Sequence, residues 1–235
     1  MYSYYYGFDW TYILVVIGAI ISLIASASVK STFNRYAKVA NRSGITGAEA
    51  AQRILKASGC YDVSVVPTKG SLTDNYNPGT GKLNLSESVY GSASVAAIGV
   101  AAHECGHAMQ HNEGYFPLQL RAKIVPVANF GSKLGIPLIL IGLIFSFFEV
   151  LIPVGIILFS FGMIFQLVTL PVEFDASRRA LAVIDDMNLL APDEATGAKK
   201  VLKSAAMTYV AAAAASILQV LRLVLLYGRG GRRRR

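Results

Sequence analysis

Residues 101–110 read Ala-Ala-His-Glu-Cys-Gly-His-Ala-Met-Gln, and the rest of the chain is interpreted around them. Positions i and i+4 of a helix lie on one face, so His103 and His107 can bind a single metal ion. Glu104 lies about 100° around the helix from His103, close enough to reach a water on that metal. This H-E-x-x-H order is typical of zinc hydrolases. The competing interpretation is two helix-surface histidines with a neighbouring glutamate.

The composition indicates a membrane protein. Of 235 residues, 54% are hydrophobic and only 15% are charged, whereas charged residues make up about a quarter of a typical soluble domain. The formal net charge is +8, and much of it comes from Arg229 and Arg232–Arg235. A basic tail beside an apolar helix favours lipid headgroups over nucleic acid. Cys60 and Cys105 are too few for a disulfide framework and are interpreted as buried free thiols.

Apolar runs predict several membrane-spanning helices. Residues 10–29 form a run long enough to cross a bilayer. A cleaved signal peptide is the alternative, but no positive charge precedes the run. Residues 134–148 and 150–171 predict a transmembrane hairpin. Residues 205–227 are also apolar enough to span, but a fourth crossing would place the arginine tail outside, against the positive-inside rule, so a packed or interfacial helix is favoured.

The region after the first run predicts a small domain on the cytoplasmic side. Lys30, Arg35 and Lys38 begin a cluster of cations directly after that run. The positive-inside rule therefore places this region in the cytoplasm and the N-terminus outside. Thr46 and Glu49 have the spacing of a capping box, which predicts the start of a helix.

Short strands and a helix follow. Residues 63–66 predict a strand, and 72–76 with 82–85 predict a hairpin. The strand over 82–85 could bind substrate by edge addition, although an ordinary hairpin strand explains it equally well. A helix capped by Ser92 or Ser94 then carries the motif. Because few of its other residues are charged, we expect it to be buried and its ionisable groups to need a metal partner.

A catalytic zinc ion needs a third protein ligand, and Glu173 is the better candidate. His111 lies two turns beyond His103 on the same helix, too far for a shared tetrahedral centre. Glu173 follows the transmembrane hairpin, where we expect it to open a new helix. A carboxylate beside a membrane span is costly without a partner. The alternative is an ion pair between Glu173 and Arg178 or Arg179.

Five stretches carry a resemblance to a known family: residues 70–76 (GSLTDNY), 85–90 (LSESVY), 94–110 (SVAAIGVAAHECGHAMQ), 172–177 (VEFDAS) and 209–213 (YVAAA). In these stretches the sequence resembles the YugP-like neutral zinc metallopeptidases of membranes. More distantly it is similar to the HtpX-like and CAAX prenyl proteases of the gluzincin group, which also place membrane helices between H-E-x-x-H and a glutamate ligand. The resemblance covers most of the chain and is most specific in the motif helix.

This resemblance implies a zinc endopeptidase. One Zn²⁺ would be held by His103, His107 and Glu173, and Glu104 would act as the general base. The distant relatives often carry an aspartate one turn after the ligand glutamate, where it orients a zinc-bound imidazole. Here that position is Ser177, so charged support for the imidazole must come from elsewhere.

Five further residues are candidates for supporting roles. Asp175 and Asp74 are the alternatives for orienting a histidine ligand. Arg178, Tyr209 and His111 are candidates for stabilising the oxyanion of a tetrahedral intermediate.

Together these features predict a mainly α membrane protein with a small α+β, zincin-like catalytic domain that carries a short β hairpin or sheet. The expected parts are an N-terminal membrane anchor (1–29), the first part of the catalytic domain (30–123), a transmembrane hairpin (124–171), the second part of the catalytic domain (172–204), and an apolar helix, spanning or packed, with an arginine-rich tail (205–235).

The predicted function is hydrolysis of peptide bonds near the cytoplasmic face of a prokaryotic plasma membrane. The substrate would be a peptide or a membrane protein, and no nucleic-acid partner is expected. One alternative is a catalytically silent scaffold or chaperone-like protein with a structural metal. A channel or transporter is disfavoured, because the apolar runs contain almost no charged groups to line a pathway.

Overall fold

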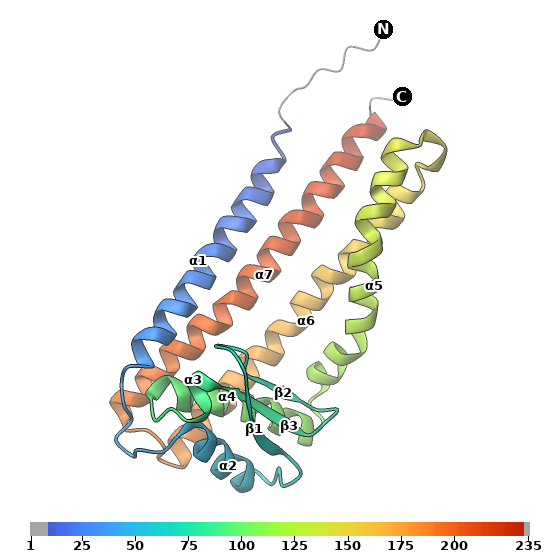
Figure 1. Ribbon diagram of the computed structural model, residues 1–235. Coiled ribbons are helices and arrows are strands. Elements are labelled where there is room, and N and C mark those ends of the chain that lie inside the picture. The colour runs from blue at the N-terminus through green and yellow to red at the C-terminus, as the bar shows by residue number, and fades with distance from the viewer. Residues whose placement is uncertain (1–8, 233–235) are drawn as a thin grey trace. The chain divides into compact units, whose positions relative to one another are not determined.

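The computed structural model describes residues 9–232 and is mainly helical, with one small sheet (Figure 1). This confirms the predicted fold class, a mainly α membrane protein with a short sheet. The elements are, in chain order, α1 (Tyr12–Tyr36), α2 (Gly47–Ala57), β1 (Ser64–Thr68), β2 (Asn75–Asn77), β3 (Lys82–Ser86), α3 (Glu87–Tyr90), α4 (Val95–Asn112), α5 (Phe116–Ile144), the 3-10 helix η1 (Ser146–Phe148), α6 (Leu151–Asp186) and α7 (Pro192–Arg232).

Within residues 9–232, four helices are long and apolar enough to cross a membrane: α1, α5, α6 and, over Pro192–Gly228, α7. The chain divides into two compact units. The membrane unit comprises Met1–Ile24, Ile124–Leu167 and Ala211–Arg235. The site unit comprises Ala25–Lys123 and Val168–Val210.

Glycines let the helices of the membrane unit approach closely. A Cβ on Gly135 would lie 2.8 Å from the carbonyl oxygen of Gly155, and a Cβ on Gly155 would lie 2.6 Å from that of Gly135. Helices α5 and α6 therefore pack backbone against backbone at this point, as small residues allow in membrane helices. Gly18 on α1 similarly faces Ala215 on α7, where an added Cβ would lie 3.2 Å away.

The site unit buries α4 among α2, the sheet, and the parts of α6 and α7 that belong to this unit. Its core is rich in alanine and aliphatic side chains, and most of α4 is buried, as predicted. The Ser94 hydroxyl caps α4 by accepting a hydrogen bond from the Ala97 N–H. The predicted capping box is also present, because Thr46 and Glu49 exchange hydrogen bonds at the start of α2.

The sheet has the strand order β1-β3-β2. Strand β3 pairs in parallel with β1 and antiparallel with β2, which confirms the predicted hairpin. The proposal that β3 binds substrate by edge addition is wrong, because this strand is central and its backbone is paired on both sides. The sequence pattern predicted the hairpin and a strand over 63–66, which corresponds to β1, but it gave no sign that β1 pairs in parallel with β3 on the side opposite β2.

The transmembrane hairpin has longer arms than predicted. Helix α5 begins at Phe116 rather than near residue 134, and α6 continues without a break through Pro171 to Asp186. The expectation that Glu173 opens a new helix is therefore wrong, and Glu173 lies inside α6. A proline removes one backbone donor, but Val172 and Ala176, on either side of Glu173, are fully buried in the site unit, and this packing holds the helix.

Candidate metal centre

Three of the predicted site residues meet in the site unit. His103 and His107 lie one turn apart on α4, and Glu173 faces them from α6. The Glu173 Oε2 atom is 3.3 Å from Nε2 of His103 and 3.5 Å from Nε2 of His107. Possible ligand atoms of these three residues all lie within 4.8 Å of one another. Among the residues that the structure describes, these three form the one group of histidine, cysteine and acidic side chains that could hold a metal ion.

The glycine inside the motif allows α4 and α6 to meet. A Cβ on Gly106 would lie 2.6 Å from the carbonyl oxygen of Ala176. Real Cβ atoms essentially never approach so closely, so any larger residue would push the two helices apart. Gly106 thus helps to place Glu173, three residues before Ala176 on α6, within reach of both imidazoles.

The geometry of this cluster fits a zinc ion. Ligand atoms about 2.1 Å from a tetrahedral zinc ion are about 3.4 Å apart, which matches both measured distances from Oε2. This oxygen is buried and has no hydrogen-bond partner, although a buried carboxylate oxygen normally requires one. A cation between Oε2 and the two Nε2 atoms would satisfy it.

Arg121 on α5 was not identified from the sequence, and it holds the other oxygen of Glu173. Its Nη1 donates to Oε1 at 3.0 Å, and the Glu173 side chain is only 3% exposed. The alternative partners considered for Glu173, Arg178 and Arg179, both pair with Asp175 instead. The available signal for Arg121 was weak: it is one of two cations, with Lys123, near the start of a long apolar segment.

The Nδ1 atoms of His103 and His107 have different partners. His103 Nδ1 lies 3.2 Å from the Ser177 hydroxyl. His107 Nδ1 lies 3.0 Å from Oε1 of Gln110, whose amide group donates to Asp175. Asp175 is thus linked to a histidine through Gln110, to which sequence reasoning gave no role.

Asp74 has a different partner. Its carboxylate accepts hydrogen bonds from the Ser86 N–H at 2.7 Å and from the Ser86 hydroxyl at 3.0 Å, at the end of β3. The pKa of Asp74 lies above its ordinary value, because the effect of burial outweighs the opposite effect of these hydrogen bonds. Asp74 is nevertheless close enough for its charge to act on Glu104.

Glu104 is buried beside the histidines, with 8% of its surface exposed. Burial raises the pKa of Glu104, and the charges of Glu173 and Asp74 act in the same direction, whereas His103 and His107 oppose them. A carboxylate with a raised pKa is a better proton acceptor near neutral pH.

The three oxyanion candidates have different surroundings. Tyr209 on α7 is close enough to Glu173 and Glu104 for their charges to act on its phenol. Arg178 is paired with Asp175, and 77% of its side chain is exposed. His111 Nδ1 is engaged with the Tyr76 hydroxyl at 2.9 Å. The structure therefore brings Tyr209, but not the other two, into contact with the charges of the centre.

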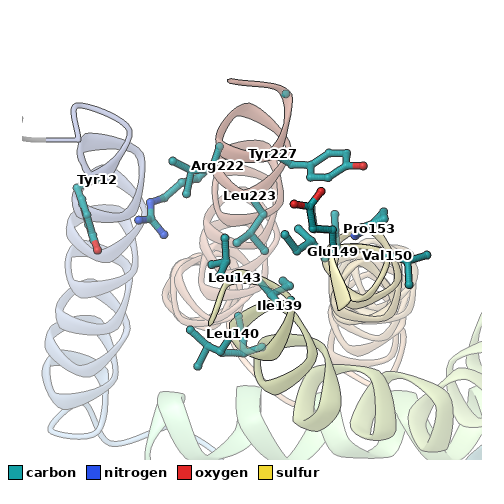
Figure 2. Close-up of a pocket in the computed structure, with 16 residues that line it drawn as sticks. Tyr12, Ile139, Leu140, Leu143, Glu149, Val150, Pro153, Arg222, Leu223 and Tyr227 are labelled. Carbon is teal, nitrogen blue, oxygen red and sulfur yellow. The ribbon is translucent and has the colours of Figure 1, made fainter. Parts of the chain in front are cut away.

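The membrane unit contains a separate cavity of about 830 Å³ with mainly apolar walls (Figure 2). Arg222 of α7 and Glu149, which precedes α6, are the charged residues among those that line it. The Arg222 guanidinium lies 3.5 Å from Asp9 and over the ring of Tyr12, 4.0 Å from its centroid. No histidine lines this cavity, so its side chains do not form a zinc-type centre.

Comparisons with known proteins point to the same chemistry. The model of a family described as "Putative neutral zinc metallopeptidase" matches residues 11–228. The chain is 48% identical over 220 residues to a protein of Bacillus subtilis (strain 168) called "Putative membrane protease YugP". The match covers 93% of this chain and 97% of that relative. No solved structure matches the chain.

Proposed function

Because the chain belongs to this neutral zinc metallopeptidase family, we propose that it is a membrane-embedded zinc endopeptidase whose metal ligands are His103, His107 and Glu173. The observation that carries the proposal is the buried Oε2 atom of Glu173, which lacks a hydrogen bond and faces two imidazole nitrogens at tetrahedral-ligand distances. One Zn²⁺ ion is sufficient for this arrangement.

The proposed mechanism assigns each polar group one task. When bound, zinc supplies a Lewis acid that lowers the pKa of a water molecule and polarises a carbonyl group. Glu104 takes the proton from the attacking water and passes it to the leaving amine. Arg121 holds the Glu173 carboxylate in place through Oε1. Tyr209 is the best placed of the three candidates to donate a hydrogen bond to the developing oxyanion.

We further propose that the site lies at the cytoplasmic face of a prokaryotic plasma membrane. Glu173 follows Leu167, the last residue of the second segment of the membrane unit, by six residues, which is about 9 Å along a helix. The cations of α1 and the loop after it, Lys30, Arg35 and Lys38, favour the cytoplasm for the site unit. Juxtamembrane segments of membrane proteins and peptides near the bilayer are the substrates that suit this position.

The predicted domain division forms part of this proposal. The anchor (1–29), the hairpin (124–171) and the last segment (205–235) would form the membrane part, and residues 30–123 with 172–204 would form the catalytic part. With α7 long and apolar enough to span, a four-helix arrangement would place both termini on the same side. That side would be outside, and the arginine tail would then be an exception to the positive-inside rule.

Replacing Glu104 with Gln tests the catalytic assignment. We expect Glu104→Gln to retain zinc and to lower casein hydrolysis by at least about 100-fold, because a positioned general base contributes about 10²–10⁴. Glu87→Gln is the matched control, since it neutralises an exposed carboxylate of the same unit. Full activity of Glu104→Gln in a preparation free of other proteases would refute the mechanism.

The silent-scaffold alternative makes a different prediction. It expects stoichiometric zinc in the wild-type protein but no hydrolysis of any peptide, with Glu104→Gln indistinguishable from wild type. The buried, raised-pKa carboxylate of Glu104 beside the metal ligands favours the enzyme, because a structural site has no use for a base.

A further inference from the structure

Gln110 is a buried polar residue of α4 that the proposed mechanism does not use. None of its surface is exposed. It lies three residues after His107, on the same face of the helix. Its Nε2 donates to the Val172 carbonyl at 2.8 Å and to Oδ2 of Asp175 at 2.9 Å, and its Oε1 faces His107 Nδ1 at 3.0 Å. All three contacts join α4 to itself or to α6.

These contacts determine which way the Gln110 amide points. A carboxamide has two N–H donors at one end and an acceptor at the other. The Val172 carbonyl and the Asp175 carboxylate can only accept, so both must face the NH₂ group. A flipped amide would place its oxygen against two other oxygens with no hydrogen between them. The carbonyl oxygen of Gln110 therefore faces His107.

The amide orientation in turn determines the histidine tautomer. An acceptor opposite Nδ1 requires a proton on Nδ1, and in a neutral imidazole this leaves the lone pair on Nε2. Nε2 is the His107 nitrogen that faces Glu173. We propose that Gln110 is a positioning residue that holds His107 as the Nδ1–H tautomer, with Nε2 ready to bind the metal ion. This inference rests on the proposed function for its purpose, but its geometry does not depend on catalysis.

The hydrogen bonds that run from Asp175 through Gln110 to His107 form a relay, and charged groups keep Asp175 ionised within it. Asp175 accepts hydrogen bonds from the Arg179 Nε at 2.6 Å and from Arg178. Two guanidinium groups stabilise the ionised carboxylate, which therefore remains an acceptor for Gln110. The charge of Asp175 thus reaches His107 through a neutral amide rather than by direct contact.

The second histidine has no such arrangement. The Ser177 hydroxyl beside His103 Nδ1 can rotate and either donate or accept. It therefore does not select a tautomer, and the His103 contact serves as an internal comparison for His107.

The first test uses the wild-type protein without metal. The chain has three histidines, so ¹⁵N-histidine NMR at alkaline pH gives few signals, and His111→Asn helps to assign them. We expect the His107 ring to show a protonated Nδ1 and an unprotonated Nε2, whereas His103 is a mixture of tautomers. A His107 ring protonated on Nε2 would overturn the proposal, and this result does not depend on any variant folding.

The second test compares zinc affinities by competition with a chelator. Gln110→Leu should weaken zinc binding by about 10–100-fold, the usual effect of removing a ligand's supporting hydrogen bond. Ser177→Ala should weaken it by no more than about threefold, the low end of a neutral hydrogen bond. Equal losses in the two variants, or none in Gln110→Leu, would refute the relay. A wild-type protein that binds no zinc would instead refute the proposed function, and the NMR result would still decide the tautomer.

Discussion

Two buried side-chain atoms lack a hydrogen-bond partner in the part of the chain that the structure describes, and each belongs to a different unit. Glu173 Oε2 lies in the site unit, and Arg222 Nε lies in the membrane unit. Both atoms are buried, and an unsatisfied buried polar atom is expensive. Their neighbours differ, and that difference distinguishes the proposed metal centre from a structural contact.

Arg222 is largely neutralised by the protein itself. Asp9 lies 3.5 Å from Nη2, and the ring of Tyr12 covers the guanidinium face at 4.0 Å from Cζ. The delocalised cation is therefore compensated by one carboxylate and by one aromatic face. Glu173 is compensated at one oxygen, because Arg121 pairs with Oε1, whereas Oε2 faces Nε2 of His103 and of His107 and has no hydrogen-bond partner. The proposed zinc ion would complete the compensation of Glu173, whereas Arg222 is compensated by Asp9 and Tyr12.

The largest expected effect comes from removing the negative charge of Glu173. Glu173→Gln should weaken zinc binding by more than the about 10–100-fold typical of a supporting residue, because it removes a ligand. Without zinc the variant should be more stable than wild type by about 1–3 kcal/mol, since the buried charge with an unsatisfied oxygen disappears. Chelator competition and thermal unfolding in detergent measure the two effects. A metal-free variant that unfolds at a lower temperature than the metal-free wild type would show that Glu173 is a structural ion-pair partner.

Metal removal gives the next effect. Zinc at about 100 times its dissociation constant should stabilise the wild-type protein by about 2.7 kcal/mol. A chelator should therefore lower the unfolding temperature of wild type but leave that of Glu173→Gln unchanged. Arg222→Met should respond to the chelator as wild type does. An equal shift in all three proteins would mean that the chelator acts somewhere other than the proposed centre.

The third effect concerns Arg121, which pairs with the Oε1 atom of Glu173. Arg121→Met should weaken zinc binding by about 10-fold, near the lower limit for a residue that orients a ligand. The arginine side chain is 30% exposed, so water can replace part of the contact. Arg121→Lys should recover some of the affinity, because it restores the charge but not the fork of donors. Unaltered zinc affinity in Arg121→Met would leave Arg121 without a role at the centre.

These residues also show what sequence reasoning can reach. His103, Glu104 and His107 lie within five positions, so the helical period alone places them together. Glu173 is far along the chain, and it was found because a carboxylate beside an apolar span needs a partner. Its place inside an unbroken α6 was not foreseen, because Pro171 is a strong local signal for a helix boundary that buried contacts overrule.

Sequence reasoning could not identify the residues that hold the proposed ligands in place, and the physical reason is different. Gln110 and Arg121 matter only through contacts of α4 and α5 with α6, and no local pattern reports how three helices meet. Asp175 was considered because it stands near Glu173 in the sequence, but its link to His107 passes through an amide whose orientation depends on the backbone of α6. Local chemistry thus pointed to the proposed ligands, and only tertiary contacts revealed which residues hold their side chains.

The smallest effect should come from the membrane unit. Arg222→Met removes the ion pair with Asp9 and the contact with Tyr12. Polar contacts between membrane helices average about 0.6 kcal/mol in measured cases, so we expect a loss of stability of that order, measured by unfolding in detergent. Zinc affinity and casein hydrolysis should equal those of wild type, because no ligand or supporting residue is changed. The double variant Asp9→Asn, Arg222→Met should be no less stable than Arg222→Met alone, since the single change already leaves Asp9 without its cation. A loss of zinc on Arg222→Met would contradict the distinction between the two clusters, because it would mean that the self-compensated arginine also serves the metal centre.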